Sequence, residues 1–167
     1  MYDGENKTLH YAAKVQANIK VKNNVLETGI EVKNTEVSYN ARTRTKNVDT
    51  SFYNGEGVSS IYSIFANYNL NKDKWNINLG ARASYYTLSS EAFVEPRVFV
   101  GYRLSETINL KGSSGIYAQY LAHVNNIEFS YGTGTGNVWK LADGDQTNIA
   151  KSWQSMVGIS FNKKIGS

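Results

Sequence analysis

Apolar and polar residues alternate strictly between Tyr11 and Val21. Successive side chains of a β-strand point to opposite faces, so this period of two residues predicts a strand with one apolar and one polar face. The odd positions are Tyr11, Ala13, Val15, Ala17, Ile19 and Val21, and the even positions are Ala12, Lys14, Gln16, Asn18 and Lys20.

The same alternation returns about six more times along the chain. A tight turn at Asn23 and Asn24 is expected to reverse the first strand into the second. The apolar phase changes sides near Asn34 and Thr35, which predicts a β-bulge. The further strands are expected at 26–41, 62–70, 75–85, 95–104, 108–120 and 153–161.

Short and long connections alternate between these strands. Polar, aperiodic stretches at 43–58, 87–93 and 122–149 are expected to be loops, and brief turns are expected at 71–74, 105–107 and 162–164. Strands of this length match the roughly 9–11 residues that cross a bilayer at a tilt. The pattern predicts an all-β fold, an antiparallel up-and-down meander of about 7–8 strands that forms a transmembrane β-barrel or part of a larger one, with the long loops outside the cell.

Aromatic residues of the apolar phase fall at the strand ends, as the two interfacial girdles of a membrane barrel do. A soluble β-sandwich is the competing fold, but a sandwich places large residues in the middle of its strands. Near the short turns the residues are Tyr68, Trp75, Tyr102 and Phe161, and near the long loops they are Tyr11, Tyr39, Tyr62, Tyr85, Tyr120 and Trp153.

An odd number of strands has a topological consequence. In a strict meander the first and seventh strands are parallel, so they cannot close antiparallel, and bacterial barrels have an even number of strands. Open strand edges do not occur in lipid. The chain is therefore expected to be part of a larger barrel, unless a loop contains another strand or several copies assemble.

Composition excludes several classes of protein. The 18 Lys and Arg against 14 Asp and Glu give a net charge of +4 that is dispersed along the chain, which argues against nucleic-acid binding. The absence of Cys excludes disulfides and thiolate metal sites. No apolar run approaches the length of a membrane helix, and the N-terminus resembles no secretory signal. We expect a mature form or an excised piece of an outer-membrane protein.

Three motifs resemble the barrel of TonB-dependent outer-membrane receptors. Glu95-Pro96-Arg97 opens one strand, the segment from Leu110 to Tyr120 contains Lys-x-Ser-x-Gly-x-Tyr-x-Gln, and 150–155 resembles the strand that these receptors place after a large extracellular loop. The resemblance implies a barrel of roughly 22 strands with an N-terminal plug. It implies uptake of a siderophore, cobalamin, a glycan or a similar ligand, with energy from a TonB-type periplasmic partner.

The sequence departs from the family pattern because it has no plug, no partner-binding segment and too few strands. We expect residues 1–167 to form a single β-barrel segment in the outer membrane of a Gram-negative cell, in contact with lipid, the remaining strands and the plug of the parent receptor. By itself the chain is not expected to transport a ligand. The alternative is a small closed outer-membrane barrel with a structural or adhesive role.

The histidines and acidic residues near the long loops have simple structural explanations. His10 and His123 lie toward the long loops with Asp143 and Asp145 nearby, but two His among many polar residues do not define an active site, so no enzyme is expected. Asp143-Gly144-Asp145 lacks the full calcium-loop pattern and reads as a turn, so neither a metal nor a cofactor is expected. The polar phase carries charges expected to pair inside the barrel: Lys14, Lys20, Lys111, Arg82, Arg97, Arg103, Glu27, Glu31 and Glu95.

Ligand contact in the parent protein is expected from the long loops, where binding residues concentrate. The stretch 122–149 offers an aromatic surface beside charged groups. The candidate ligand-binding residues are Trp139, Lys140, Asp143 and Asp145.

Overall fold

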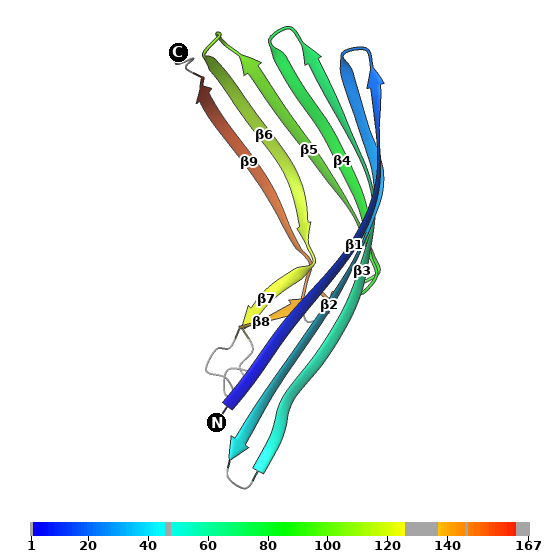
Figure 1. The fold of residues 1–167 in the computed structure, drawn as a ribbon, viewed down its shortest axis with the longest axis vertical. Helices are drawn as coiled ribbons and strands as arrows, with labels where there is room; N and C mark the ends of the chain where they lie inside the picture. The colour runs from blue at the N-terminus through cyan, green and yellow to red at the C-terminus, as the bar shows by residue number, and fades with distance from the viewer. Residues whose placement is uncertain (1, 46–47, 126–136, 146, 163–167) are drawn as a thin grey trace, which may run out of the picture.

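The computed structural model describes residues 2–45, 48–125, 137–145 and 147–162 of the 167-residue chain. Within these residues, seven strands form one antiparallel sheet in the order β1-β2-β3-β4-β5-β6-β9 (Figure 1). This confirms the predicted all-β meander. The strands are β1 (Tyr2–Val21), β2 (Asn24–Thr45), β3 (Val48–Lys72), β4 (Trp75–Tyr86), β5 (Glu91–Arg103), β6 (Ile108–Gln119) and β9 (Ala150–Phe161).

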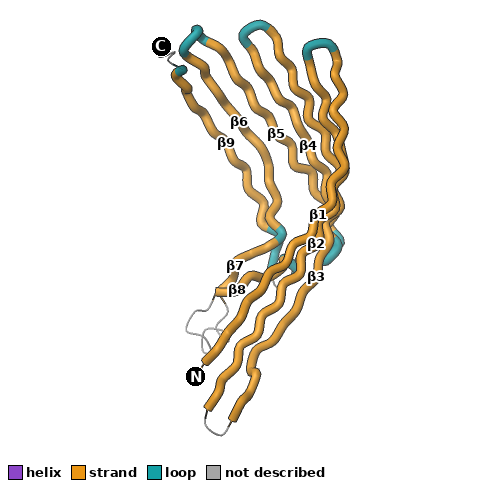
Figure 2. The backbone as a smooth tube through the Cα atoms, viewed as in Figure 1, coloured by secondary structure: helices purple, strands orange, loops and turns teal. Residues whose placement is uncertain are grey.

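Short turns join the strands at one end of the sheet, which we name the turn end (Figure 2). The first turn differs from the prediction, because Val21 pairs with Asn24 and the reversal therefore takes place at Lys22 and Asn23. Lys22 adopts a φ of 56°, a left-handed conformation that was expected of Asn. The turn predicted at 162–164 lies outside the described residues except for Asn162.

The opposite end, the loop end, contains more strand than the sequence predicted. β1, β2 and β3 are 20, 22 and 25 residues long, whereas the other strands of the sheet have 12 or 13. The predicted loop at 43–58 is wrong, because β2 and β3 stay paired as far as Thr45 and Val48. Main-chain hydrogen bonds hold this extension together. Any residue other than proline can make them, so the sequence here need not alternate between apolar and polar side chains. Among the described residues, no helix is long and apolar enough to cross a membrane.

The predicted bulge at Asn34 and Thr35 is also wrong. The register between β2 and both of its neighbours runs unbroken through these residues, and the shift in register lies at Ala41 and Arg42. The apolar phase changes for another reason. Val37, only 3% exposed, lies on a face that a separate hairpin covers at the loop end.

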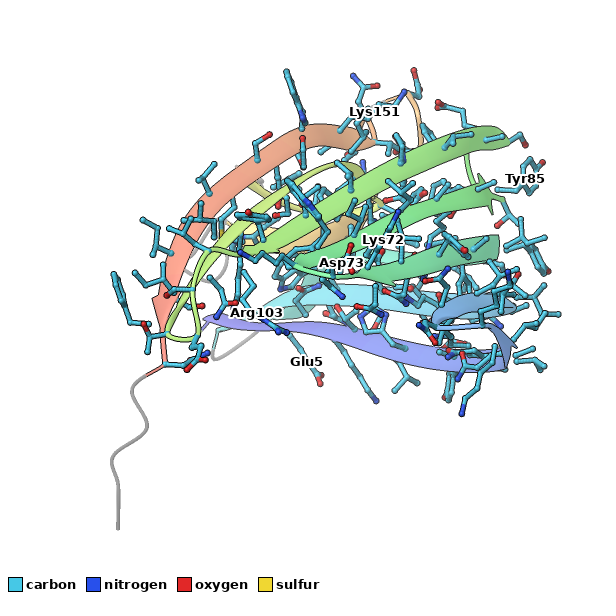
Figure 3. The ribbon with its side chains drawn as sticks, turned by 90° about the horizontal axis from the view of Figure 1, so that it is seen from above. Glu5, Lys72, Asp73, Tyr85, Arg103 and Lys151 are labelled. Carbon is cyan, nitrogen blue, oxygen red and sulfur yellow. The ribbon has the colours of Figure 1, made fainter. Side chains whose placement is uncertain are left out.

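The two faces of the sheet have opposite character. The outer face carries apolar side chains that are mostly exposed, such as Val15, Ile64 and Leu79. The inner face carries polar and charged groups, together with buried Phe65 and Glu95. Figure 3 shows Tyr85 projecting away from the sheet on the outer side.

The predicted positions of the aromatic residues at the strand ends are confirmed in part. At the turn end, Trp75 and Tyr102 are cross-strand partners with ring centroids 4.5 Å apart. At the loop end, Tyr62 pairs with Tyr85 on the outer face. Tyr120 was placed incorrectly, because its ring packs against Tyr86 and Phe93 of the inner face. Tyr39 also lies on the inner face, because it follows Thr35 and Val37 at every second position of β2.

Candidate functional site

A small hairpin, the β7–β8 hairpin, lies across the loop end of the sheet (Figure 1). It consists of β7 (Leu121–Asn125) and β8 (Asn137–Leu141), within the stretch that was predicted to be aperiodic. β8 contacts β1, β2 and β3. Val138 and Leu141 are buried, Leu141 faces Gly57, and the Trp139 amide donates to Asn6 Oδ1 at 3.0 Å. The hairpin is therefore docked against the inner face of the long strands.

The hairpin carries two of the four candidate ligand-binding residues. Trp139 stacks on His123 with ring centroids 4.8 Å apart, and 40% of the tryptophan remains exposed. Lys140 forms an ion pair with Asp143, with Nζ and Oδ2 3.4 Å apart. An aromatic surface and a cation thus lie on adjacent residues of β8.

Asp143 organises the turn that follows the hairpin. Its Oδ1 accepts hydrogen bonds from the amides of Thr147, at 2.7 Å, and Asp145, at 3.1 Å. Gly144, at a φ of 82°, approaches Ser89 so closely that an added Cβ would lie 2.9 Å from the serine Cβ. Of the four candidates, Trp139, Lys140 and Asp143 therefore have side-chain contacts within the structure, while Asp145 is exposed in the same turn.

The environment of Asp143 favours its charged form. Partial burial acts to raise the pKa of the carboxyl, but the two amides and the nearby Lys140 ammonium outweigh it and hold this pKa below its ordinary value. A carboxyl with a lowered pKa stabilises the folded turn above the ordinary Asp pKa of about 3.9, and this contribution is lost as pH falls through the folded pKa.

Acid is therefore expected to loosen the turn at 143–147. In the natural protein that contains this chain, pepsin should cleave beside this turn, at the buried Leu141, faster as pH falls below about 4. Asp143→Asn keeps a side-chain oxygen as acceptor but does not titrate, so it should remove most of the extra pH dependence. Cleavage mapped by mass spectrometry would contradict this account if the two proteins showed the same pH dependence.

Ion pairs line the inner face, as the sequence predicted. Glu31 accepts from Arg82 and also lies 3.5 Å from Lys33 Nζ, and Arg97 lies 3.7 Å from Glu95. The prediction of paired inner-face charges is confirmed for Glu31, Glu95, Arg82 and Arg97.

Glu95-Pro96-Arg97 marks the point where two strands separate. The pairing of β5 with β6 ends at Arg97 and Gly115, next to Pro96, which has no N–H to donate. Beyond it, β5 continues beside β4 while β6 continues beside β9. The buried Glu95 carboxylate spans this separation by accepting from the Ala118 amide at 3.0 Å. The Glu95 side chain thus accepts the hydrogen bond from the Ala118 amide, which a main-chain carbonyl of β5 would accept if the two strands were still paired.

The family model described as TonB dependent receptor-like, beta-barrel matches residues 2–156. This chain belongs to the TonB-dependent receptor family. The predicted resemblance is thereby confirmed, and the family comprises outer-membrane receptors rather than a class of enzymes.

A solved structure supports the fold assignment of this TonB-dependent receptor barrel. The crystal structure of the siderophore receptor PirA from Acinetobacter baumannii is similar to it, with a TM-score of 0.53 and 18% identity. The match covers 97% of this chain but only 26% of the PirA chain, so this chain spans about a quarter of that receptor's length. A search of curated proteins gave no match.

Aromatic residues on the inner face of this receptor segment were not predicted from the sequence. Tyr86 is fully buried, and its ring centroid lies 4.9 Å from that of Tyr120, which also contacts Phe93. The Tyr120 carbonyl accepts from the Ala142 amide, which ties this cluster to the end of the β7–β8 hairpin. One feature of the sequence could have indicated them, because Phe65, Tyr86 and Phe93 are large aromatic residues at positions where a strand otherwise has polar or small side chains.

The histidines of this receptor barrel have structural contacts. His10 Nδ1 lies 3.0 Å from Thr35 Oγ1, and His123 stacks on Trp139. In the part of the chain that the structure describes, no group of three or more His, Cys, Asp or Glu side chains is placed to hold a metal ion.

Proposed function

We propose that this chain forms part of the wall of an outer-membrane receptor that imports a ligand with energy from a TonB-type partner. The observation that supports this most is the division of one long-stranded meander into an exposed apolar outer face and a charged inner face. In a bilayer, the outer face contacts lipid and the inner face lines the lumen.

The edges of the sheet indicate what else the receptor needs. Among the described residues, β1 and β9 are not paired with each other, and both run from the loop end to the turn end. A second copy in the same orientation would offer only parallel partners at these edges. We infer that antiparallel strands from the parent receptor complete the barrel around a plug. A small closed barrel would instead need an even number of strands in its sheet.

Ligand capture is assigned to the loop end, which faces the cell exterior in this orientation. PirA is a siderophore receptor, and a siderophore is one candidate ligand of this chain's receptor beside cobalamin and glycans. Trp139 supplies an exposed aromatic face, Lys140 a cation and Asp145 an exposed carboxylate, while Asp143 holds the turn that positions Asp145.

Loop variants test this assignment in the natural protein that contains the chain. Trp139→Ala and Asp145→Ala are each expected to weaken binding of the imported ligand by roughly tenfold, about 1.4 kcal/mol, because truncating an important contact residue costs more than about 1 kcal/mol. Binding is measured by titration of the purified receptor with the ligand that supports growth of its host.

Two matched variants serve as controls. Trp153→Ala removes an exposed tryptophan from the outer face of β9, and Asp73→Asn changes a carboxylate at the turn end. Neither should alter ligand affinity. Unchanged affinity in both loop variants would remove the β7–β8 hairpin and its following turn from the proposed site.

A further inference from the structure

A polar pocket of about 220 Å³ lies on the inner face, away from the candidate ligand-binding residues. Its side chains come from five consecutive strands, β1 to β5. Cross-strand pairing brings them together, since Phe65 pairs with Arg82 and Gly80 pairs with Arg97. The lining residues are Lys14, Glu27, Phe65, Asn67, Ala81, Arg82 and Arg97.

Phe65 holds two cations at this pocket. The ring is only 5% exposed, with Lys14 Nζ 4.5 Å from its centroid and Arg82 Cζ 5.6 Å from it. Gly29 leaves room for the ring, because a Cβ at Gly29 would lie 2.8 Å from Phe65 Cζ. Cation–π attraction therefore keeps an ammonium and a guanidinium together on one aromatic surface.

Two cationic side chains of this pocket, those of Lys14 and Arg82, have a donor without an acceptor among the described residues. Arg82 shares Glu31 with Lys33, yet its own Nε is buried without a hydrogen-bond partner. Within the described residues, Lys14 has no ion-pair partner. Of the three lining cations, Arg97 pairs with Glu95 and Arg82 pairs with Glu31. In the described part of the chain, the Lys14 ammonium and the Arg82 Nε remain without an acceptor, and these two groups favour an additional negative group.

We propose that this pocket binds an oxyanion of the carboxylate or phosphate type between Lys14 and Arg82. The inference rests on the proposed function, because that function makes the inner face a lumen through which solutes pass. The anion has two possible sources with the same chemistry: a free solute or an acidic side chain of a segment that fills the lumen. An acidic group at this position supplies the acceptor that the Arg82 Nε and the Lys14 ammonium lack.

Inorganic phosphate is the probe for the free-solute source. The purified natural protein, in a buffer without other polyvalent anions, is titrated calorimetrically with phosphate. Lys14→Gln should weaken phosphate binding at least tenfold, and Lys14→Arg should retain it. Lys20→Gln is the matched control, because Lys20 lies in the polar phase of the same strand but does not line the pocket. This control should bind phosphate like the wild type.

Thermal unfolding distinguishes the second source. If an internal carboxylate fills the pocket, wild-type protein should not bind phosphate, and Lys14→Gln should lower the melting temperature by several degrees more than Lys20→Gln does. Either result supports an anion site. The proposal is overturned if the Lys14→Gln and Lys20→Gln proteins behave alike in both measurements. Ligand binding by the loop variants is scored separately, so failure of the pocket and failure of the proposed receptor function are distinguishable.

Discussion

Replacing Val15 with arginine is expected to lower the free energy of unfolding of the receptor in lipid by about 2–4 kcal/mol. Val15 lies midway along the periodic part of β1, on the outer face, and 69% of its surface is exposed. The substitution therefore removes little packing within the chain. The expected loss comes from placing a guanidinium in hydrocarbon, where water is absent and the charge is poorly solvated.

Gln16→Arg is the matched control for Val15→Arg. Gln16 is the next residue of β1, at nearly the same depth, but it lies on the inner face and is also exposed. This variant should change the free energy of unfolding by less than about 1 kcal/mol. Both are measured by denaturant-induced unfolding of the natural protein in lipid vesicles. Equal losses from the two variants would contradict the assignment of the outer face to lipid.

Replacing Glu95 with alanine is expected to cost about 3 kcal/mol of stability, because removal of one partner leaves a buried ionic network unpaired. The Ala118 amide would lose its acceptor, and Arg97 would lose the carboxylate 3.7 Å away. Since this carboxylate spans the point where β5 and β6 separate, the end of β6 should also loosen. Hydrogen exchange at 116–119 should accelerate together with the loss of stability.

Two further variants identify the cause of this effect. Glu95→Gln keeps an oxygen that accepts from Ala118 but removes the charge, so it should cost about 1 kcal/mol. Glu91→Ala changes an exposed carboxylate of the same strand and should be near neutral. If Glu95→Ala were as mild as Glu91→Ala, the role of Glu95 in bridging the separated strands would be wrong.

Periodicity predicted the meander because successive residues of a strand point to opposite faces of the sheet, and in a membrane barrel one face is apolar and the other is polar. From Tyr11 to Val21 and from Trp75 to Tyr85, each outer position is apolar and each inner position is small or polar, so the strand and its faces could be predicted directly from the sequence. The same signal located the turns to within about one residue. At the first turn, the left-handed residue proved to be Lys22, because the register of β1 against β2 determines where the chain reverses.

The remaining parts of the fold depend on contacts between distant segments. The extension of β2 and β3 beyond residue 42 rests on backbone pairing, which has no sequence period. Apolar residues change faces near Asn34 because the distant β7–β8 hairpin covers Val37 on the inner face. In the sequence, this change has the same pattern as a β-bulge. The hairpin strands are five residues each, too short to show a period of two.

The candidate site could be predicted only in part. Loop position and side-chain type selected Trp139, Lys140, Asp143 and Asp145, and the structure brings them into one hairpin and its following turn. The structural role of Asp143 could not be predicted, because the hydrogen bonds that it accepts from the amides of Asp145 and Thr147 depend on the path of the turn. The inner pocket could not be predicted from the sequence either, since only the register of four strands brings Lys14, Phe65 and Arg82 together.

The most direct test of the account is a scan of β1 with single cysteines from Tyr11 to Val21 in the natural protein, reconstituted in lipid vesicles. The chain has no cysteine, so it adds no competing label in this segment. Each position is spin-labelled, and its accessibility to oxygen and to a water-soluble nickel complex is measured. Strict alternation is expected, with high oxygen accessibility at the odd positions and high nickel accessibility at the even ones. High nickel accessibility at both sets would show that the outer face does not lie in lipid, and would contradict the account.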